Sequence, residues 1–301
     1  MYLHESNDFK EILNKTHEET GLEPSIIEKD YYVSMMLKNL SRTKYSFIFK
    51  GGTSLSKAYK VINRFSEDID LTITQKPTQG ERVGLATAIM ECAKSIGLTI
   101  INRDKIRRRG QFNRFVFEYS PITEESSIMP QIVVESYLTL LAFPVENKQI
   151  DSFIGNILNK YNKDILIKYN LESFDMPVQS IKRTLIDKVF ALCDYYLAGK
   201  SDKYSRHIYD IYQIINCLSL SNIDKQLITC VRKERQKDER CLSAKNGIDI
   251  EQILMEIINN HYYAKDYEER TLALLFDEVS YSEAIKAVEQ IIQSNLFSSN
   301  H

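Results

Sequence analysis

The 301-residue chain lacks the sequence features that mark several large protein classes. It contains no internal repeat and no low-complexity segment, and no apolar run approaches the roughly 18 residues of a membrane span. The opening sequence MYLHESNDFKEIL has no apolar signal core and reads as the start of a helix. We therefore expect neither a secreted nor a membrane-spanning protein. A net charge of −2 at pH 7 argues against a strongly basic nucleic-acid binder, although a local basic patch stays compatible with it.

Cysteine and histidine are too few and too scattered to build a disulfide framework or a zinc site. The five cysteines form no CxxC pair, and the five histidines show no metal-ligand spacing. We expect reduced thiols, mostly in the helical core of a cytoplasmic protein. They are Cys92, Cys193, Cys217, Cys230 and Cys241.

What remains is an ordinary globular composition, with 43% hydrophobic and 27% charged residues. The pattern changes after about residue 150, and from Ile181 onward a 3.6-residue period dominates. The sequence therefore predicts an α+β protein with two domains. An N-terminal α/β domain with a mixed sheet spans residues 1–170, and an all-helical domain spans residues 171–301. The loop from Leu171 to Pro177 is the predicted boundary.

Periodicity and turn residues predict the individual elements. The predicted N-terminal helices are Asn7–Thr20, Pro24–Leu40 and Gly80–Gly97. Predicted strands follow at Leu98–Asn102, Phe112–Tyr119, Gln131–Tyr137 and Leu140–Val145. The predicted C-terminal helices are Ser180–Ala198, Tyr204–Leu220, Ile223–Arg235, Ile250–Asn259, Tyr267–Phe276 and Ser282–Leu296.

The segment FIFKGGTSLSKAYKVINRFSEDIDL, residues 47–71, is the most informative part of the chain. It reads as a strand, a tight turn at Gly51-Gly52, a helix and a second strand. Glycine lets the backbone approach a ligand closely, and the N-terminus of the following helix offers free N–H groups to an anion. Thr53 and Ser54 add two hydroxyls at the same place.

Two carboxylates, Asp68 and Asp70, lie on the second predicted strand. Side chains alternate along a strand, so these two point the same way and repel each other unless a cation lies between them. Mg²⁺ is the usual cation for all-oxygen sites that bind phosphate. A DxD or a GG alone is most often a turn. Together they predict a site for a metal-bound nucleoside triphosphate.

Other charged residues have both a structural and a functional interpretation. Glu135, in the run IVVES, is either on the solvent face of a strand or a third carboxylate, acting as metal ligand or proton acceptor. Lys188 either extends to solvent from an apolar helix or reaches the triphosphate. Arg206 and Asp210 form either an i,i+4 pair or part of a cleft that positions nucleotide or Lys188.

Two further charged groups are less specific. For Glu28, Lys29 and Asp30, at the start of a helix, a structural role is the default interpretation. The second group is a basic cluster in a predicted hairpin, which is either a charged sheet edge or a contact for RNA phosphates. Its members are Arg103, Lys105, Arg107, Arg108 and Arg109.

The motif KGGTSLSKAY…RFSEDIDL resembles the signature of the AbiEii-type toxin nucleotidyltransferases, including MenT-like toxins, of the DNA polymerase β-like superfamily. IEKDYYVSMML lies upstream of this motif, and IVVESY, LIDKVFAL and SRHIYDIYQI lie downstream, all in the family's order, so the resemblance spans roughly residues 25–215. One position departs from the pattern: His207 replaces the first aspartate of the Arg-Asp-x-x-Asp motif, which leaves Asp210 as the better candidate.

The resemblance implies a magnesium-dependent NTP transferase fold, in which Asp68 and Asp70 would hold Mg²⁺. Glu135 is the predicted third metal ligand, and these three residues with Lys188 and Asp210 form the predicted catalytic set. The predicted nucleotide-binding residues are Gly51, Gly52, Thr53, Ser54, Lys57, Ser66 and Arg206.

The resemblance also implies a bacterial toxin–antitoxin or phage-defence (abortive infection) role. The partners would be an NTP, an acceptor that we expect to be the 3′ end of tRNA, as in some relatives, and a separately encoded antitoxin, often with a winged-helix domain. A protein or small-molecule hydroxyl is an alternative acceptor. A non-catalytic NTP- or RNA-binding regulator is the alternative from another class, although retention of both aspartates argues against it.

Overall fold

The computed structural model describes residues 1–123 and 128–298, which form two compact units. The first unit comprises Met1–Ala58 and Glu67–Val178, and the second comprises Tyr59–Ser66 and the chain from Gln179 onward. The division after Val178 lies further along the chain than the predicted one after residue 170. The short 59–66 segment, which was expected in the N-terminal domain, belongs to the helical unit. No helix among the described residues is both long and apolar enough to cross a membrane.

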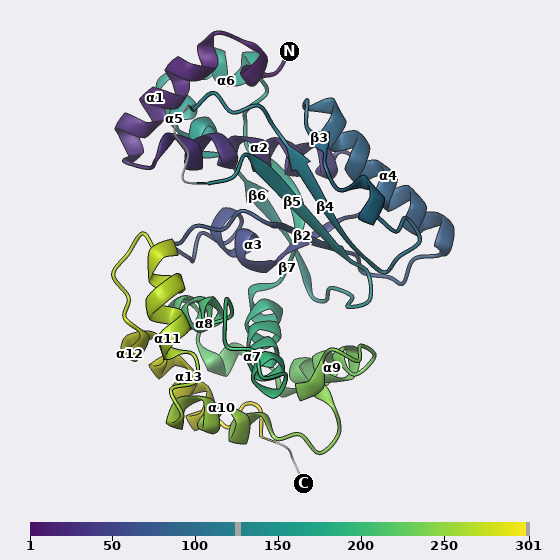
Figure 1. Cartoon of the computed structure of the whole chain (residues 1–301), viewed down its shortest axis with the longest axis vertical. Helices are drawn as coiled ribbons and strands as arrows, with labels where there is room; N and C mark the ends of the chain where they lie inside the picture. Colours follow the sequence, from purple (N-terminus) through teal and green to yellow (C-terminus); the bar gives the residue numbers. More distant parts are fainter. Residues whose placement is uncertain (124–127, 299–301) are drawn as a thin grey trace. The chain divides into compact units, whose positions relative to one another are not determined.

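The first unit is built on a mixed seven-stranded sheet with the order β3-β4-β5-β2-β1-β7-β6 (Figure 1). Adjacent strands are antiparallel except for two parallel pairs, β2 with β5 and β1 with β7, among those whose direction is assigned. The strands are β1 (Ile48–Lys50), β2 (Ile69–Thr72), β3 (Thr99–Ile100), β4 (Phe112–Glu118), β5 (Gln131–Tyr137), β6 (Val145–Ile150) and β7 (Phe174–Gln179). The α+β prediction is confirmed.

One face of the central strands is buried and the other is partly open. In β5, Ile132 and Val134 are fully buried, whereas Glu135 and Tyr137 are half-buried, as period-2 alternation requires. Tyr32 of α2 stacks on Tyr119, just after β4, with ring centroids 4.3 Å apart, so α2 covers the buried face. Its opposite, partly open face carries the charged residues described below.

Helices of the first unit pack around this sheet. They are α1 (Asp8–Thr20), α2 (Pro24–Ser41), α3 (Gly51–Lys57), α4 (Gln79–Ser95), α5 (Phe153–Tyr161) and α6 (Lys163–Lys168). The start of α4 is set by a capping box, in which the Thr78 hydroxyl accepts from the Glu81 N–H and the Glu81 carboxylate accepts from the Thr78 N–H at 2.7 Å.

Several local predictions for this unit are wrong. The expected strand at Leu140–Val145 is a loop and β6 begins at Val145, because Pro144 has no N–H for a strand ladder. The loop expected at Leu171–Pro177 contains most of β7, whose Val178 pairs with Phe49 of β1. Helices α5 and α6 were not predicted, although Ser152 caps α5 by accepting the Gly155 N–H at 2.9 Å.

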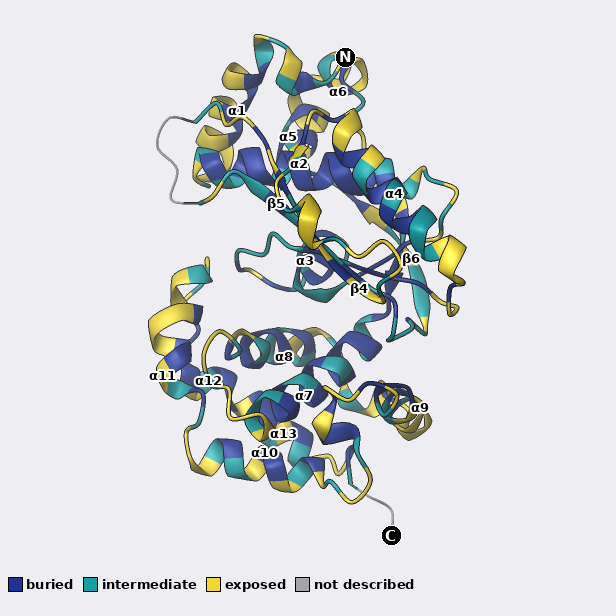
Figure 2. Ribbon diagram, turned by 45° about the vertical axis from the view of Figure 1, so that its right-hand side comes forward, coloured by how far each residue is buried: buried dark blue, intermediate teal, exposed yellow. Residues whose placement is uncertain are grey.

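The second unit is helical, as predicted. Its main helices are α7 (Ile181–Leu197), α8 (Arg206–Cys217), α9 (Lys225–Arg235), α10 (Ile250–Asn259), α12 (Tyr281–Ala284) and α13 (Lys286–Gln293). The predicted helix Tyr267–Phe276 is instead a π-helical turn followed by the 3₁₀ turn Leu272–Leu274. Helices α7 and α8 have more buried residues than the other helices of this unit (Figure 2).

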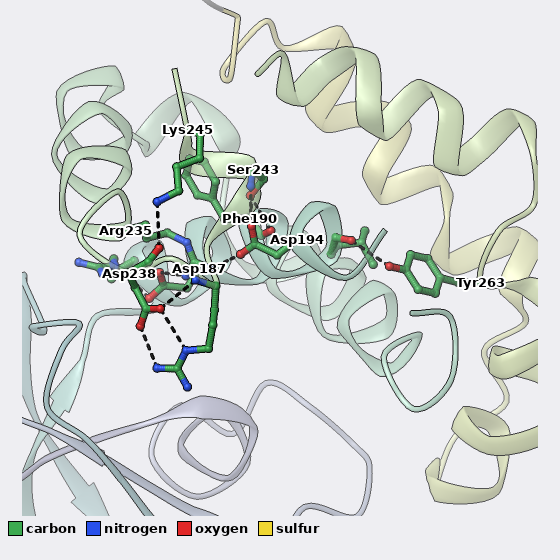
Figure 3. Close-up of polar contacts among 11 residues, drawn as sticks. Asp187, Phe190, Asp194, Arg235, Asp238, Ser243, Lys245 and Tyr263 are labelled. Carbon is green, nitrogen blue, oxygen red and sulfur yellow. Dashed lines mark hydrogen bonds and ion pairs between the residues drawn. The ribbon is translucent and has the colours of Figure 1, made fainter. Parts of the chain in front are cut away.

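A buried ion-pair network joins α7 to α9 and to the 3₁₀ turn Leu242–Ala244 (Figure 3). Arg235 donates to Asp187 at 3.0 Å and to Asp194 at 2.6 Å. Asp194 also accepts from the backbone N–H and the hydroxyl of Ser243, at 2.7 and 2.6 Å. Although burial opposes the charged form, Asp187 and neighbouring acidic groups raise the pKa of the Arg235 guanidinium, so it stays charged.

We expect Arg235→Met to lower the free energy of unfolding by about 3–5 kcal/mol, because Asp194 would remain buried without its counterion, whereas the partly exposed Asp187 keeps its ion pair with Arg183. Urea denaturation followed by circular dichroism measures the change. Lys265→Met is the control, because Lys265 is 86% exposed and pairs only loosely with Glu269, at 3.8 Å. Equal unfolding midpoints for the two variants would show that the network contributes little.

Candidate active site

Four charged residues form one row across the sheet. Backbone register pairs Lys50 with Asp70, Asp70 with Glu135, and Glu135 with Arg114. Because paired residues on neighbouring strands point to the same face, all four side chains project from the partly open face. The two carboxylates are therefore neighbours, with one cation on each side of the pair. Arg114 Nε lies 3.6 Å from Glu135 Oε1.

Asp68 adds a third carboxylate to this neighbourhood. It lies one residue before β2 rather than on the strand, as was predicted, and two residues from Asp70. Burial first, and then the negative charges of Asp70 and Asp68, raise the pKa of the Glu135 carboxyl above its ordinary value. Arg114 and Lys50 act in the opposite direction without cancelling the effect. The arrangement keeps acidic groups close together at an electrostatic cost.

The glycine predicted to form a turn is the first residue of α3, and it lies against Asp70. Gly51 adopts φ +79°, and a Cβ added there would lie 1.9 Å from Asp70 Oδ2. Only glycine combines this left-handed backbone with the space that the carboxylate requires. The close approach explains why the motif has glycine at this position, and it keeps α3 beside the carboxylate row.

The other predicted nucleotide-binding residues of this motif differ in exposure. Thr53 and Ser54 are buried, and the Ser54 hydroxyl donates to the Gly51 carbonyl at 2.8 Å. Lys57 is also buried and donates to Asp30 at 2.5 Å, so it holds α3 to α2. Ser66 is half-buried, in the segment before Asp68. The roles of these residues toward a nucleotide stay predictions.

The acidic-basic run at residues 28–30 connects α2 to the site. Lys29 forms an ion pair with Glu67, the residue immediately before Asp68, and donates to the Met129 carbonyl. Asp30 accepts from Lys57 and from the Phe153 N–H. Glu28 accepts from the backbone of Ile122 at 2.9 Å. These contacts are structural, in line with the default interpretation.

In the helical unit, Lys188 and Asp210 form a buried ion pair, with 2.5 Å between Nζ and Oδ2. The i,i+4 pair between Arg206 and Asp210, one of the two interpretations of these residues, is absent from the ion pairs of the described residues, and Arg206 is exposed. Asp210 is instead held by Arg64, whose Nε and Nη2 donate to its two oxygens at 2.7 and 2.8 Å. This bidentate pair positions the carboxylate that in turn positions Lys188.

The charges of this cluster are mutually dependent. Although burial acts against ionisation of Asp210, Arg64 and Lys188 hold the pKa of its carboxyl well below the usual range. Burial lowers the pKa of the Lys188 amine, an effect that Asp210 opposes. Burial and the neighbouring Lys188 and Arg206 also lower the pKa of His207, which stacks on Tyr195 and stays neutral.

Arg64 is the residue that the sequence interpretation missed. It anchors the 59–66 segment in the helical unit, together with three backbone contacts. Asn63 N–H donates to the Tyr209 hydroxyl, Phe65 N–H to the Leu274 carbonyl, and Phe276 N–H to the Asn63 carbonyl. The segment continues directly into Glu67 and Asp68. The signal that could have identified Arg64 is its position in the motif, four residues before Asp68.

Comparisons with known proteins identify the family. The family described as "Nucleotidyl transferase AbiEii toxin, Type IV TA system" matches residues 36–294. This chain belongs to that family. It is therefore a nucleotidyltransferase and the toxin component of a type IV toxin–antitoxin system, as the resemblance implied.

The fold of this AbiEii-family chain is similar to that of a solved toxin. MenT4, a nucleotidyltransferase toxin from Mycobacterium tuberculosis H37Rv, aligns with a TM-score of 0.59 and 16% sequence identity. The alignment covers 97% of this chain and 90% of MenT4. At this identity the likeness shows the shared fold. No curated protein sequence matches the chain significantly.

The carboxylate row is chemically suited to Mg²⁺, which prefers oxygen ligands from one or two carboxylates. Within residues 1–123 and 128–298, no three His, Cys, Asp or Glu side chains converge as a finished metal site. The backbone register nevertheless places Asp70 beside Glu135 on one face of the sheet. Burial raises the pKa of Glu135 most, and repulsion from Asp70 and Asp68, which a cation would relieve, raises it further.

We expect Glu135→Gln to raise the thermal unfolding midpoint at pH 7, in the absence of divalent ions, by roughly 1–3 °C. When a carboxyl has a higher pKa in the folded protein than in the unfolded chain, the folded protein loses stability as the pH rises from the unfolded pKa to the folded pKa. The gain should therefore vanish below about pH 4.3, the ordinary glutamate pKa. Scanning calorimetry across pH tests this, with Glu118→Gln, an exposed residue of β4, as the control. A pH-independent gain would contradict the electrostatic explanation.

Removing Arg64 tests the buried cluster of the helical unit. We expect Arg64→Met to cost about 3–5 kcal/mol of unfolding free energy, because Asp210 would lose its bidentate partner while staying buried. Guanidinium denaturation measures the loss, and Arg206→Met, at an exposed arginine, should change stability by less than about 0.5 kcal/mol. If the two variants unfolded alike, Arg64 would not be the anchor of this cluster.

Proposed function

We propose that this toxin transfers a nucleoside monophosphate from a Mg²⁺-bound NTP to the 3′ end of tRNA. The single observation that carries the proposal is the in-register pair of Asp70 and Glu135, with Asp68 two residues away and Gly51 against Asp70. A row of acidic groups on an open sheet face destabilises the metal-free protein. A ligand that supplies positive charge would relieve this repulsion.

The reaction follows from these groups. The oxygen of the acceptor hydroxyl attacks the α-phosphorus of the NTP, and the bond from the α-phosphorus to the bridging oxygen of the β-phosphate breaks. Pyrophosphate leaves with the electron pair of that bond. Glu135 is the group we assign to accept the proton of the attacking hydroxyl, because its raised pKa makes it a better base than an ordinary carboxylate.

Asp68 and Asp70 would hold Mg²⁺, with Glu135 at the edge of the set. Bound there, the ion would neutralise phosphate charge and orient the triphosphate. The backbone at Gly51 and Gly52 is proposed to contact the phosphates, with Thr53, Ser54, Lys57 and Ser66 shaping that contact. Lys188, oriented by Asp210, is proposed to balance charge on the leaving pyrophosphate, and Arg206 to bind the nucleotide.

Membership of a type IV toxin–antitoxin family implies a partner antitoxin. We propose that the antitoxin is separately encoded and carries a winged-helix domain, and that the toxin acts in the cytoplasm, where NTP and tRNA are present. Growth would stop because tRNA with an altered 3′ end cannot be aminoacylated.

The test is incubation of the purified protein with Mg²⁺, total bacterial tRNA and each α-labelled NTP in turn, resolved on a denaturing gel. We expect label on tRNA from one NTP, abolished by Asp68→Ala and by Asp70→Ala. Asp175→Ala, an exposed aspartate of β7, is the matched control and should retain transfer. Circular dichroism should show that all three variants are folded.

A second readout does not depend on transfer. Mg²⁺ with a non-hydrolysable NTP analogue should raise the unfolding midpoint of the wild-type protein and of Asp175→Ala, but not of Asp70→Ala. Label on a protein or small molecule, with none on RNA, would show that the acceptor is a protein or small-molecule hydroxyl. Transfer that survives in both aspartate variants would refute the mechanism, and nucleotide binding without any transfer would favour a non-catalytic regulator.

A further inference from the structure

An aromatic pair lies beside the carboxylate row and has no role in the proposed chemistry. Phe112 of β4 is paired in register with Tyr137 of β5, and their rings meet edge to face with centroids 5.6 Å apart. Lys50 Nζ lies 5.1 Å from the centroid of the Tyr137 ring. Phe112 is 38% exposed, although β4 is an interior strand of the sheet.

The register sets the position of this pair relative to the acidic residues. Phe112 and Tyr137 are each two residues from the next pair on the same face, Arg114 with Glu135. Side chains two residues apart lie on one face, about 7 Å apart along the strand. The aromatic pair therefore occupies the row next to Glu135 on the open face. β4 and β5 lie side by side in Figure 1.

The chain that enters β4 carries exposed cations on an ordered loop. The basic cluster, Arg103, Lys105, Arg107, Arg108 and Arg109, is exposed throughout. Asn113, a buried residue of β4, binds both the N–H and the carbonyl of Arg107, at 2.8 and 3.0 Å. Asn102 likewise bonds the Arg114 carbonyl and the Val116 N–H, at 2.7 and 2.9 Å. The loop is thus preformed, and its last cation is three residues from Phe112.

We infer that Phe112, supported by Tyr137, is a stacking platform for the terminal base of a single-stranded RNA 3′ end. Sequence-tolerant binding of single strands combines backbone phosphates on cations with bases on aromatic rings, and both parts meet here. A base on Phe112 places the ribose of the same nucleotide toward the neighbouring row, where Glu135 lies. Phe112 is therefore assigned as a positioning residue for the acceptor. This inference rests on the proposed function for its occupant.

Charge complementarity favours RNA over the NTP at this platform. The basic cluster supplies five cations along the approach to β4, more than a single triphosphate engages. The motif residues proposed for the NTP lie on α3 and the segment before β2, two strands from β4 in the sheet order. The acceptor strand and the NTP would then approach the carboxylate row from different strands.

The chain has no tryptophan, so a single introduced indole reports on this position alone. We would place tryptophan at the platform with Phe112→Trp and titrate a short single-stranded RNA with a free 3′ hydroxyl, in EDTA and without NTP. The expected result is quenching of the indole emission by the stacked base. Tyr161→Trp is the control, because Tyr161 is 48% exposed on α5, which packs on α1 and α2. Its emission should not change.

Phe112→Ala should weaken binding of the same RNA, labelled and followed by anisotropy, by roughly tenfold or more. The KM for the RNA acceptor should rise while the KM for NTP is unchanged. Circular dichroism confirms that the variant is folded, and Phe112→Tyr, which keeps the ring, should bind as the wild type does.

Three outcomes would overturn the inference. These are unquenched emission from Phe112→Trp with saturating RNA, quenching by NTP in place of RNA, or unchanged RNA affinity in Phe112→Ala. The RNA-binding measurements contain neither metal nor NTP, so a failure of RNA binding can be told apart from a failure of nucleotide transfer. Quenching by RNA with no transfer to any acceptor would refute the proposed transfer and leave the platform standing.

Discussion

Electrostatic repulsion within the acidic row is the constraint on which the rest of the site depends. Parallel pairing of β2 with β5 fixes Asp70 beside Glu135, and neither strand can shift by one residue without moving every side chain to the opposite face. The buried face of the sheet therefore holds the repelling groups together. Gly51 leaves space for the Asp70 carboxylate, and the flanking cations, Lys50 and Arg114, offset part of the negative charge.

A second electrostatic arrangement has the opposite character. Arg64, Asp210 and Lys188 are buried and mutually paired, so their charges are satisfied within the protein. Removing one partner is costly, whereas an apolar replacement of the whole cluster need not be. We therefore interpret the buried cluster as a device that fixes the positions of its three side chains rather than as a source of net stability. Arg64 also fixes the segment that leads to Asp68, which links the helical unit to the carboxylates through the chain itself.

The elements that sequence patterns predicted well are those with strong local signals. The alternation in Gln131–Tyr137 and the period in Ile250–Asn259 match the structure residue for residue. Two strand predictions failed near Pro144 and Pro177, because proline is uncommon within strands. One strand was placed too early, and β7 was missed. The candidate residues Asp70, Glu135, Lys188 and Asp210, whose roles stay predictions, were all singled out by residue type and motif. Arg64 was not, because its partner is 146 positions away.

The sequence by itself determined the α+β class and the family, and it singled out the acidic, glycine and lysine residues of the candidate site, because short-range spacing and residue chemistry are enough for these. Only the tertiary structure decided which of them are neighbours. The register that joins Asp70 to Glu135, the pairing of Asp210 with Arg64 in place of Arg206, and the row formed by Phe112 and Tyr137 all involve residues distant in the chain. Local propensity carries no information about such contacts, since they are selected by burial of the whole sheet and helix faces.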